Sequence, residues 1–87
     1  MLNRTQPIVT SAQLGALLVN VRKSRKLTQA QLGTRLGLSQ KRISELELAP
    51  GTLSVDQLLG MCAQLGLHFS LQLREDNPPA QPPETDW

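Results

Sequence analysis

Residues 29–46 leave few folds open to this chain, because a glycine turn joins two short helical segments there. Gly37 follows the first segment and supplies, without steric cost, the left-handed conformation that such a turn requires. Gly33 lies one helical turn earlier, where two closely crossing helices need a small residue. The apolar residues expected to face inward from both segments are Leu32, Leu36, Leu38, Ile43 and Leu46. The sequence therefore predicts two helices that cross closely.

Capping residues mark where these two helices begin. Thr28 and Gln31 have the spacing of a capping box, which predicts the start of the helix before the turn. Ser39 is a preferred N-cap residue and predicts the start of the helix after it. We expect that helix to run to about Glu47, because Pro50 and the glycine after it form a loop.

Two further helices are expected, one on each side of this pair. Ser11 can cap a helix that runs to about Lys26. Ser54 and Gln57 have capping-box spacing and begin a last helix, which Gly66 ends. Their expected apolar faces are Leu14, Leu17, Leu18 and Val21 on the one, and Val55, Leu58, Leu59, Cys62 and Leu65 on the other.

The hydrophobic period changes from helical to alternating after Gly66. Apolar and polar residues alternate over residues 67–74, which predicts a strand with one buried face. Residues 8–9 are only a weak candidate for its partner, and unpaired backbone groups are costly. We therefore expect the strand to pair with the same strand of a second copy across a two-fold axis. The expected dimerisation residues are Leu67, Phe69, Leu71 and Leu73.

Charge is distributed unevenly along the chain. Residues 1–74 contain all nine lysines and arginines and three of the seven acids, whereas residues 75–87 contain four acids and no base. A basic body indicates a polyanionic partner, and an acidic end indicates a different one. We expect residues 1–10 to be a flexible leader. Residues 75–87 also hold four of the six prolines and are expected to be a disordered tail.

The pattern around the glycine turn is that of a helix-turn-helix unit, and it resembles the Xre/Cro class of phage-repressor-like domains. The segments that carry the resemblance are residues 27–33, 37–40 and 43–47. Gly33 departs mildly from the alanine that is commoner there, which lowers helix propensity. The resemblance implies a mainly α fold with four to five helices over residues 11–66. The predicted strand would follow and pair across a dimer, with the disordered tail after it.

Nearly the whole chain also resembles HipB-type antitoxins of the same class. Three features carry this resemblance: a body of five structural elements, a final strand of alternating hydrophobicity, and an acidic tail that ends in Asp86 and Trp87. It implies a cytoplasmic homodimer that represses its own operon and binds a HipA-type serine/threonine kinase toxin. Trp87 is the expected toxin-binding anchor, since tryptophan is enriched at binding hot spots; an inert tail end is the alternative. A stand-alone phage-type repressor without a toxin partner also stays open, and it would explain everything except the tail.

Candidate DNA contacts lie at the start of the recognition helix and one turn further on. The expected base-reading residues are Ser39, Gln40, Lys41 and Ser44. Glutamine can bond adenine through both amide atoms, and lysine can reach guanine. The expected phosphate contacts are Gln29, Arg35 and Arg42, the first of them carried over from the matching glutamine of phage-type repressors. Four further basic residues are candidates either for phosphate contact or for plain solvation: Arg22, Lys23, Arg25 and Lys26.

Two acids of the recognition helix are left out of this set. Glu45 could accept a hydrogen bond from cytosine or balance Arg42, whereas Glu47 is expected to be structural.

Other functional classes fit the sequence less well. The sequence contains no metal-ligand cluster, phosphate-binding glycine loop or nucleophile–base pair, so we expect no enzyme, no metal and no cofactor. His68 lies on the polar side of the predicted strand, and the single cysteine, Cys62, is expected to be a small core hydrophobe. An interaction-only domain would tolerate acids or bulky apolar residues at positions 39–42, where Ser, Gln, Lys and Arg stand instead. No apolar stretch has the length of a membrane span, and no signal peptide is expected.

Overall fold

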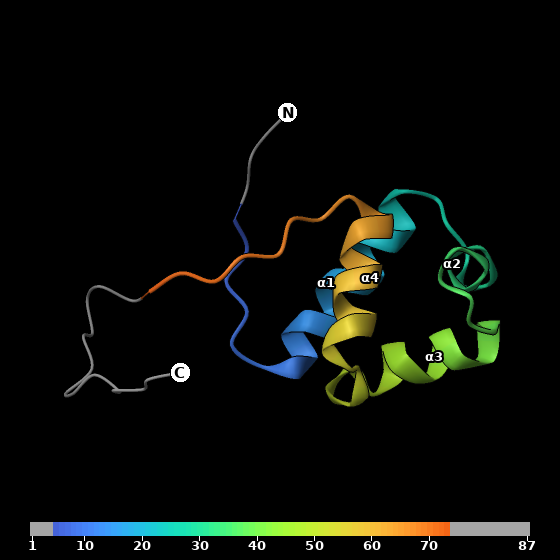
Figure 1. Cartoon of the computed structure of the whole chain (residues 1–87), viewed down its shortest axis with the longest axis horizontal. Coiled ribbons are helices and arrows are strands. Elements are labelled where there is room, and N and C mark those ends of the chain that lie inside the picture. The colour runs from blue at the N-terminus through green and yellow to red at the C-terminus, as the bar shows by residue number, and fades with distance from the viewer. Residues whose placement is uncertain (1–4, 74–87) are drawn as a thin grey trace.

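The computed structural model describes residues 5–73, which form four α-helices and one turn of 3-10 helix. The elements are α1 (Ser11–Ser24), α2 (Gln29–Leu36), α3 (Gln40–Leu48), η1 (Pro50–Thr52) and α4 (Val55–Leu65). Helices α1 and α4 pack against each other, and α2 and α3 lie beside this pair, to its right in Figure 1. The structure thus confirms the mainly α architecture with four to five helices.

Three of the four α-helices begin with a capping box made of a hydroxyl residue and a glutamine. The pairs are Thr10–Gln13, Thr28–Gln31 and Ser54–Gln57. The prediction that Ser11 caps the first helix is wrong by one residue, because the hydroxyl of Thr10 accepts from the third amide and Gln13 returns the bond. That helix also ends at Ser24, before Lys26, whose φ of 61° is left-handed and cannot continue a helix.

The glycine turn has the predicted geometry. Gly37 adopts a left-handed conformation (φ 73°, ψ 27°) and ends α2. The amide of Leu38 donates to the carbonyl oxygen of Gly33 at 2.8 Å, and Gly33 itself is buried where the two helices cross. The local geometry therefore sets the angle at which α3 leaves α2.

The hydrophobic core takes residues from all four α-helices: Leu18, Leu32, Ile43, Leu46, Met61 and Leu65. The predicted apolar face of α4 is partly wrong. Val55 is 70% exposed and Leu59 is 44% exposed, whereas Met61, which the pattern did not assign, is 1% exposed. The helix buries the face that contains Leu58 and Met61, so Leu59, one residue on from Leu58, is rotated toward the outside.

Cys62 lies on the buried face of α4, where the sequence places a small apolar residue. Its side chain is buried, and this burial raises the pKa of the thiol above its usual range. The neutral thiol is thus favoured, which suits packing rather than reactivity.

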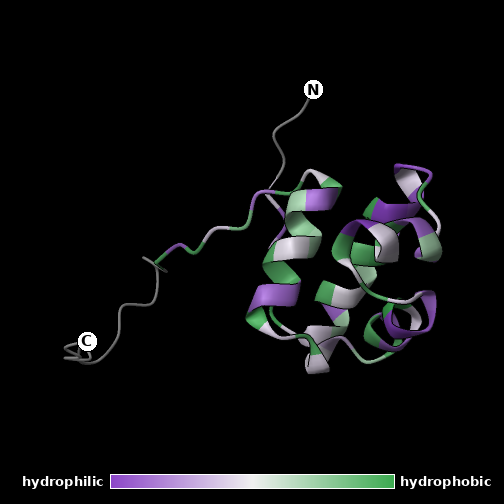
Figure 2. Cartoon of the chain, turned by 45° about the vertical axis from the view of Figure 1, so that its right-hand side comes forward, coloured by the Kyte–Doolittle hydropathy of each residue, from purple (hydrophilic) through white to green (hydrophobic). Residues whose placement is uncertain are grey.

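The segment after α4 runs away from the helical body (Figure 1). Hydrophobic and hydrophilic residues alternate along residues 67–73 (Figure 2). Leu67 packs against the core, but Phe69, Leu71 and Leu73 are 46%, 89% and 89% exposed. No strand forms within residues 5–73 of the single chain. The expected pairing involves a second copy, so it stays a prediction.

Candidate nucleic-acid interface

The first turn of α3 presents three of the expected base-reading residues to the outside. Ser39, Gln40 and Lys41 are all exposed. The hydroxyl oxygen of Ser39 accepts a hydrogen bond from the backbone amide of Arg42 at 3.0 Å and so caps the helix. Its hydroxyl hydrogen can still be donated outward. The turn therefore offers an amide, an ammonium group and a hydroxyl at one helix start.

The two remaining candidate contacts on α3, Ser44 and Arg42, are less accessible than the first three. Ser44 is half-buried, which limits its reach toward a partner. Arg42 is also half-buried, and its Nη1 lies 3.2 Å from Oε1 of Glu45. The sequence left open whether Glu45 balances the charge of Arg42, and in the structure the two side chains form this ion pair. Arg35, near the end of α2, is exposed.

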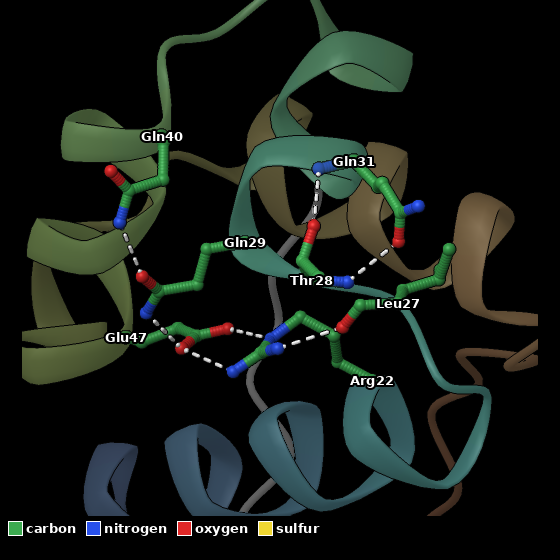
Figure 3. Close-up of polar contacts among 7 residues, drawn as sticks. All are labelled: Arg22, Leu27, Thr28, Gln29, Gln31, Gln40 and Glu47. Atoms are coloured by element: carbon green, nitrogen blue, oxygen red, sulfur yellow. Dashed lines mark hydrogen bonds and ion pairs between the residues drawn. The ribbon is translucent and has the colours of Figure 1, made fainter.

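Gln29 and Gln40 come from the starts of α2 and α3 and lie in direct contact (Figure 3). Nε2 of Gln40 donates to Oε1 of Gln29 at 2.7 Å. In turn, Nε2 of Gln29 donates to Oε1 of Glu47 at 2.9 Å. The predicted phosphate contact and a predicted base-reading residue are thus adjacent, and they belong to one hydrogen-bonded chain.

Arg22 lies at the buried end of this series of hydrogen bonds. Its Nε and Nη2 lie 2.6 Å and 3.1 Å from the two carboxylate oxygens of Glu47, and Nη1 donates to the carbonyl oxygen of Leu27 at 2.8 Å. The side chains of Arg22 and Glu47 are each 9% exposed. Both readings of Arg22, as a phosphate contact or as a solvated surface residue, are therefore wrong: its guanidinium is paired inside the domain. The structural reading of Glu47 agrees with its place in this pair.

The other basic residues near the end of α1 divide into two kinds. Nε of Arg25 donates to the carbonyl oxygen of Leu65 at 2.9 Å, which ties α1 to the end of α4. Lys23 and Lys26 are exposed. Of the four basic residues that the sequence groups here, only these two lysines have no hydrogen bond or ion pair from the side chain within residues 5–73.

The expected dimerisation residues lie away from α3 (Figure 1). Phe69, Leu71 and Leu73 follow α4 on the exposed segment, and two α4 residues, Val55 and Leu59, are exposed as well. Trp87 lies outside the described residues.

The sequence located the exposed residues of α3 but missed the link from Gln40 to Glu47. No periodicity or motif connects Gln29 with an acid 18 residues later, and only the crossing of α2 and α3 brings them together. Within residues 5–73, no group of three metal-ligating side chains occurs. None of the helices in that part of the chain is both long and apolar enough to cross a membrane.

Comparisons with known proteins agree with this geometry. The family model described as "Helix-turn-helix" matches residues 18–72. A solved structure described as a HipB-O1-O2 complex is similar to the chain, with a TM-score of 0.71 and 26% sequence identity. The similarity covers 78% of this chain and 99% of that one. No curated protein sequence matches.

The family match covers more than half of the chain and includes α2, the glycine turn and α3. The solved structure adds that the whole helical arrangement, and not the central motif alone, is shared with HipB. The family contains DNA-binding regulators rather than enzymes. The chain therefore belongs to the helix-turn-helix family of DNA-binding regulators, as an Xre/Cro-type domain similar in fold to HipB.

Proposed function

We propose that this protein is a transcriptional repressor that binds a palindromic operator as a homodimer. We further propose that it is the antitoxin of a HipA-type serine/threonine kinase toxin and represses the operon that encodes both proteins. The observation that carries the DNA-binding part is the first turn of α3, where Gln40 and Lys41 are exposed and the amide of Gln40 contacts that of Gln29.

The chemistry of this turn suits the major groove. The Gln40 amide can pair with adenine and the Lys41 ammonium can reach O6 and N7 of guanine, while Ser39 suits either a base or a phosphate. Arg35, which is exposed, would neutralise one phosphate, and Gln29 at the N-terminus of α2 would donate a hydrogen bond to another. Ser44 would contact a base and Arg42 a phosphate, both over a shorter reach.

A palindromic operator follows from the expected dimer. Three apolar side chains after α4 are exposed in the single chain: Phe69, Leu71 and Leu73. In a two-stranded sheet that pairs across a two-fold axis they would share one face, which would pack on helices. The two recognition helices would then meet half-sites about one helical turn apart, roughly 34 Å centre to centre.

The toxin partnership is supported by the similarity to HipB and by the composition of the tail. Acidic residues at positions 75–87 would steer the tail toward a basic groove, and Trp87 would fill a pocket there. The prolines of the tail would limit the entropy that is lost on ordering.

Operator selection tests the DNA-binding part. The full-length protein is incubated with duplexes that contain a randomised central region, and bound duplexes are sequenced over several rounds. We expect an inverted repeat, and we expect the same repeat upstream of the protein's own gene. If no sequence is enriched, sequence-specific repression is wrong.

The toxin partnership has a separate test. A gene for a serine/threonine kinase directly beside this one is expected, and the purified kinase should form a stable complex with the repressor on gel filtration. If the neighbouring gene encodes no kinase and no complex forms, the stand-alone phage-type repressor remains.

A further inference from the structure

The carboxylate of Glu47, near the end of α3, is held in place between α1 and α2. Two contacts from Arg22 hold its oxygens at 2.6 Å and 3.1 Å, and the arginine is itself anchored to the carbonyl oxygen of Leu27 (Figure 3). With both side chains 9% exposed, bulk water has little access to the pair. Glu47 therefore presents one rigid acceptor to Gln29.

This acceptor determines which way round two amides lie. A carboxylate can only accept hydrogen bonds, whereas an amide has a donor end and an acceptor end. Gln29 must therefore turn Nε2 toward Glu47, which leaves its Oε1 pointing to Gln40. Gln40 must in turn offer Nε2 to that oxygen. The orientation of the outermost amide follows from the buried acid, two hydrogen bonds away.

The atoms left over at Gln40 are its Oε1 and the second N–H of its amide. One acceptor beside one donor is the pattern that pairs with N6–H and N7 of adenine in the major groove. We propose that Glu47 is a specificity-determining positioning residue, which acts through Gln29 to hold the Gln40 amide in the orientation that reads adenine. This inference rests on the proposed function, since it requires that α3 reads DNA bases.

The test is a base-preference profile, measured by competition among four duplexes that differ only at the position read by Gln40. That position is the one whose preference Gln40→Ala removes. In Glu47→Gln the buried group can donate as well as accept, so neither orientation of the Gln29 amide is enforced. We expect the preference of the full-length protein for adenine to fall by about tenfold at this position, with other positions unchanged.

Two further variants separate orientation from stability. Arg22→Lys weakens the buried pair but leaves the acceptor-only group in place, so it should lower the melting temperature without changing the profile. Gln29→Met breaks the link while the Arg22–Glu47 pair stays intact, so it should reproduce the loss of adenine preference in a stably folded protein. It also carries the test if Glu47→Gln does not fold.

Exchange of the two groups provides a rescue. In the double variant Gln29→Glu with Glu47→Gln, a carboxylate again faces Gln40, and the adenine preference should return even though the added charge weakens binding to every duplex.

Several outcomes would overturn the inference. If Glu47→Gln and Gln29→Met weaken binding to all four duplexes equally, Glu47 is only structural and Gln29 only a phosphate contact. The inference also falls if Gln40→Ala alters no position of an enriched operator, although the proposed function would survive. If the wild-type protein enriches no operator, both are wrong.

Discussion

The backbone amide of Leu38 donates to the carbonyl oxygen of Gly33 at 2.8 Å, and a Cβ atom added to Gly33 would collide with the carbonyl oxygen of Leu38. Both contacts involve backbone, which can yield less easily than a side chain. The glycine thus lets the chain pass closely over the end of α2. This close approach requires a residue without a Cβ atom, even though glycine favours a helix less than other residues do.

We expect Gly33→Ala to destabilise the domain by about 1–2 kcal/mol. Crowding of this kind costs about 1–3 kcal/mol, and the better helix propensity of alanine recovers up to about 1 kcal/mol. Urea denaturation followed by circular dichroism measures the difference. Ala30→Gly, on the exposed side of α2, is the matched control and isolates the propensity effect. A more stable Gly33→Ala variant would mean that the turn relaxes freely.

Removal of Arg22 should be much more harmful than removal of the whole ion pair. Arg22→Met leaves the carboxylate of Glu47 buried without its partner, which is expected to cost about 3–5 kcal/mol. Replacement of both members, Arg22→Met with Glu47→Leu, should recover most of that loss because no buried charge remains. Thermal melts of the three proteins decide this. Equal destabilisation of the single and double variants would contradict the expected desolvation cost.

Base-reading and phosphate-contacting residues should differ in how their loss affects binding. Gln40→Ala and Lys41→Ala should each cost about 1–3 kcal/mol and relax specificity at one position per half-site. Arg35→Ala should weaken binding to all sequences alike and reduce the salt slope of binding by about one. Fluorescence anisotropy at several salt concentrations measures both effects. If both Gln40→Ala and Lys41→Ala bind the operator with wild-type affinity, α3 is not the recognition helix.

Leu71→Pro should convert the proposed dimer to a monomer. Proline removes a backbone donor that strand pairing needs, and Leu71 is 89% exposed, so the helical core of each subunit should be unaffected. Light scattering gives the mass, and Leu48→Asp, which changes a residue that is 84% exposed on α3, is the control. A variant that stays dimeric would place the interface elsewhere, and exposed Val55 and Leu59 make α4 the next candidate.

Loss of the last residue should separate the two binding functions. Deletion of Trp87 is expected to weaken the kinase complex by about 2 kcal/mol or more, as for other hot-spot residues, while operator affinity stays nearly unchanged. Thr85→Ala in the same tail is the control. Calorimetry with the kinase and anisotropy with the operator can use the same preparation. Equal kinase affinity with and without Trp87 would show that the tail is not the anchor.

The sequence predicted those parts of the fold that depend on neighbouring residues. The capping boxes at Thr28 and Ser54, the left-handed Gly37 and the small Gly33 are local features, and the structure reproduces them, whereas the cap of α1 is Thr10 and not Ser11. The partners of Arg22 and Gln29 could not be predicted in this way. Glu47 lies 25 and 18 residues from them, and its position depends on how the helices cross.

The burial of Met61 in place of Leu59 has the same origin. Helical periodicity shows that α4 has an apolar side, but two adjacent apolar residues leave its rotation open by about 100°. Only the packing of the other helices against α4 fixes which of them faces the core.

The capping boxes have a consequence for how the protein responds to its medium. They are built from hydroxyls, amides and backbone groups, so their hydrogen bonds involve no titrating group and no ion pair that salt could screen. Contacts with DNA phosphates, by contrast, weaken steeply as salt rises. An increase in ionic strength should thus detach the protein from DNA while its helices remain formed, so that release would need no refolding to be reversed.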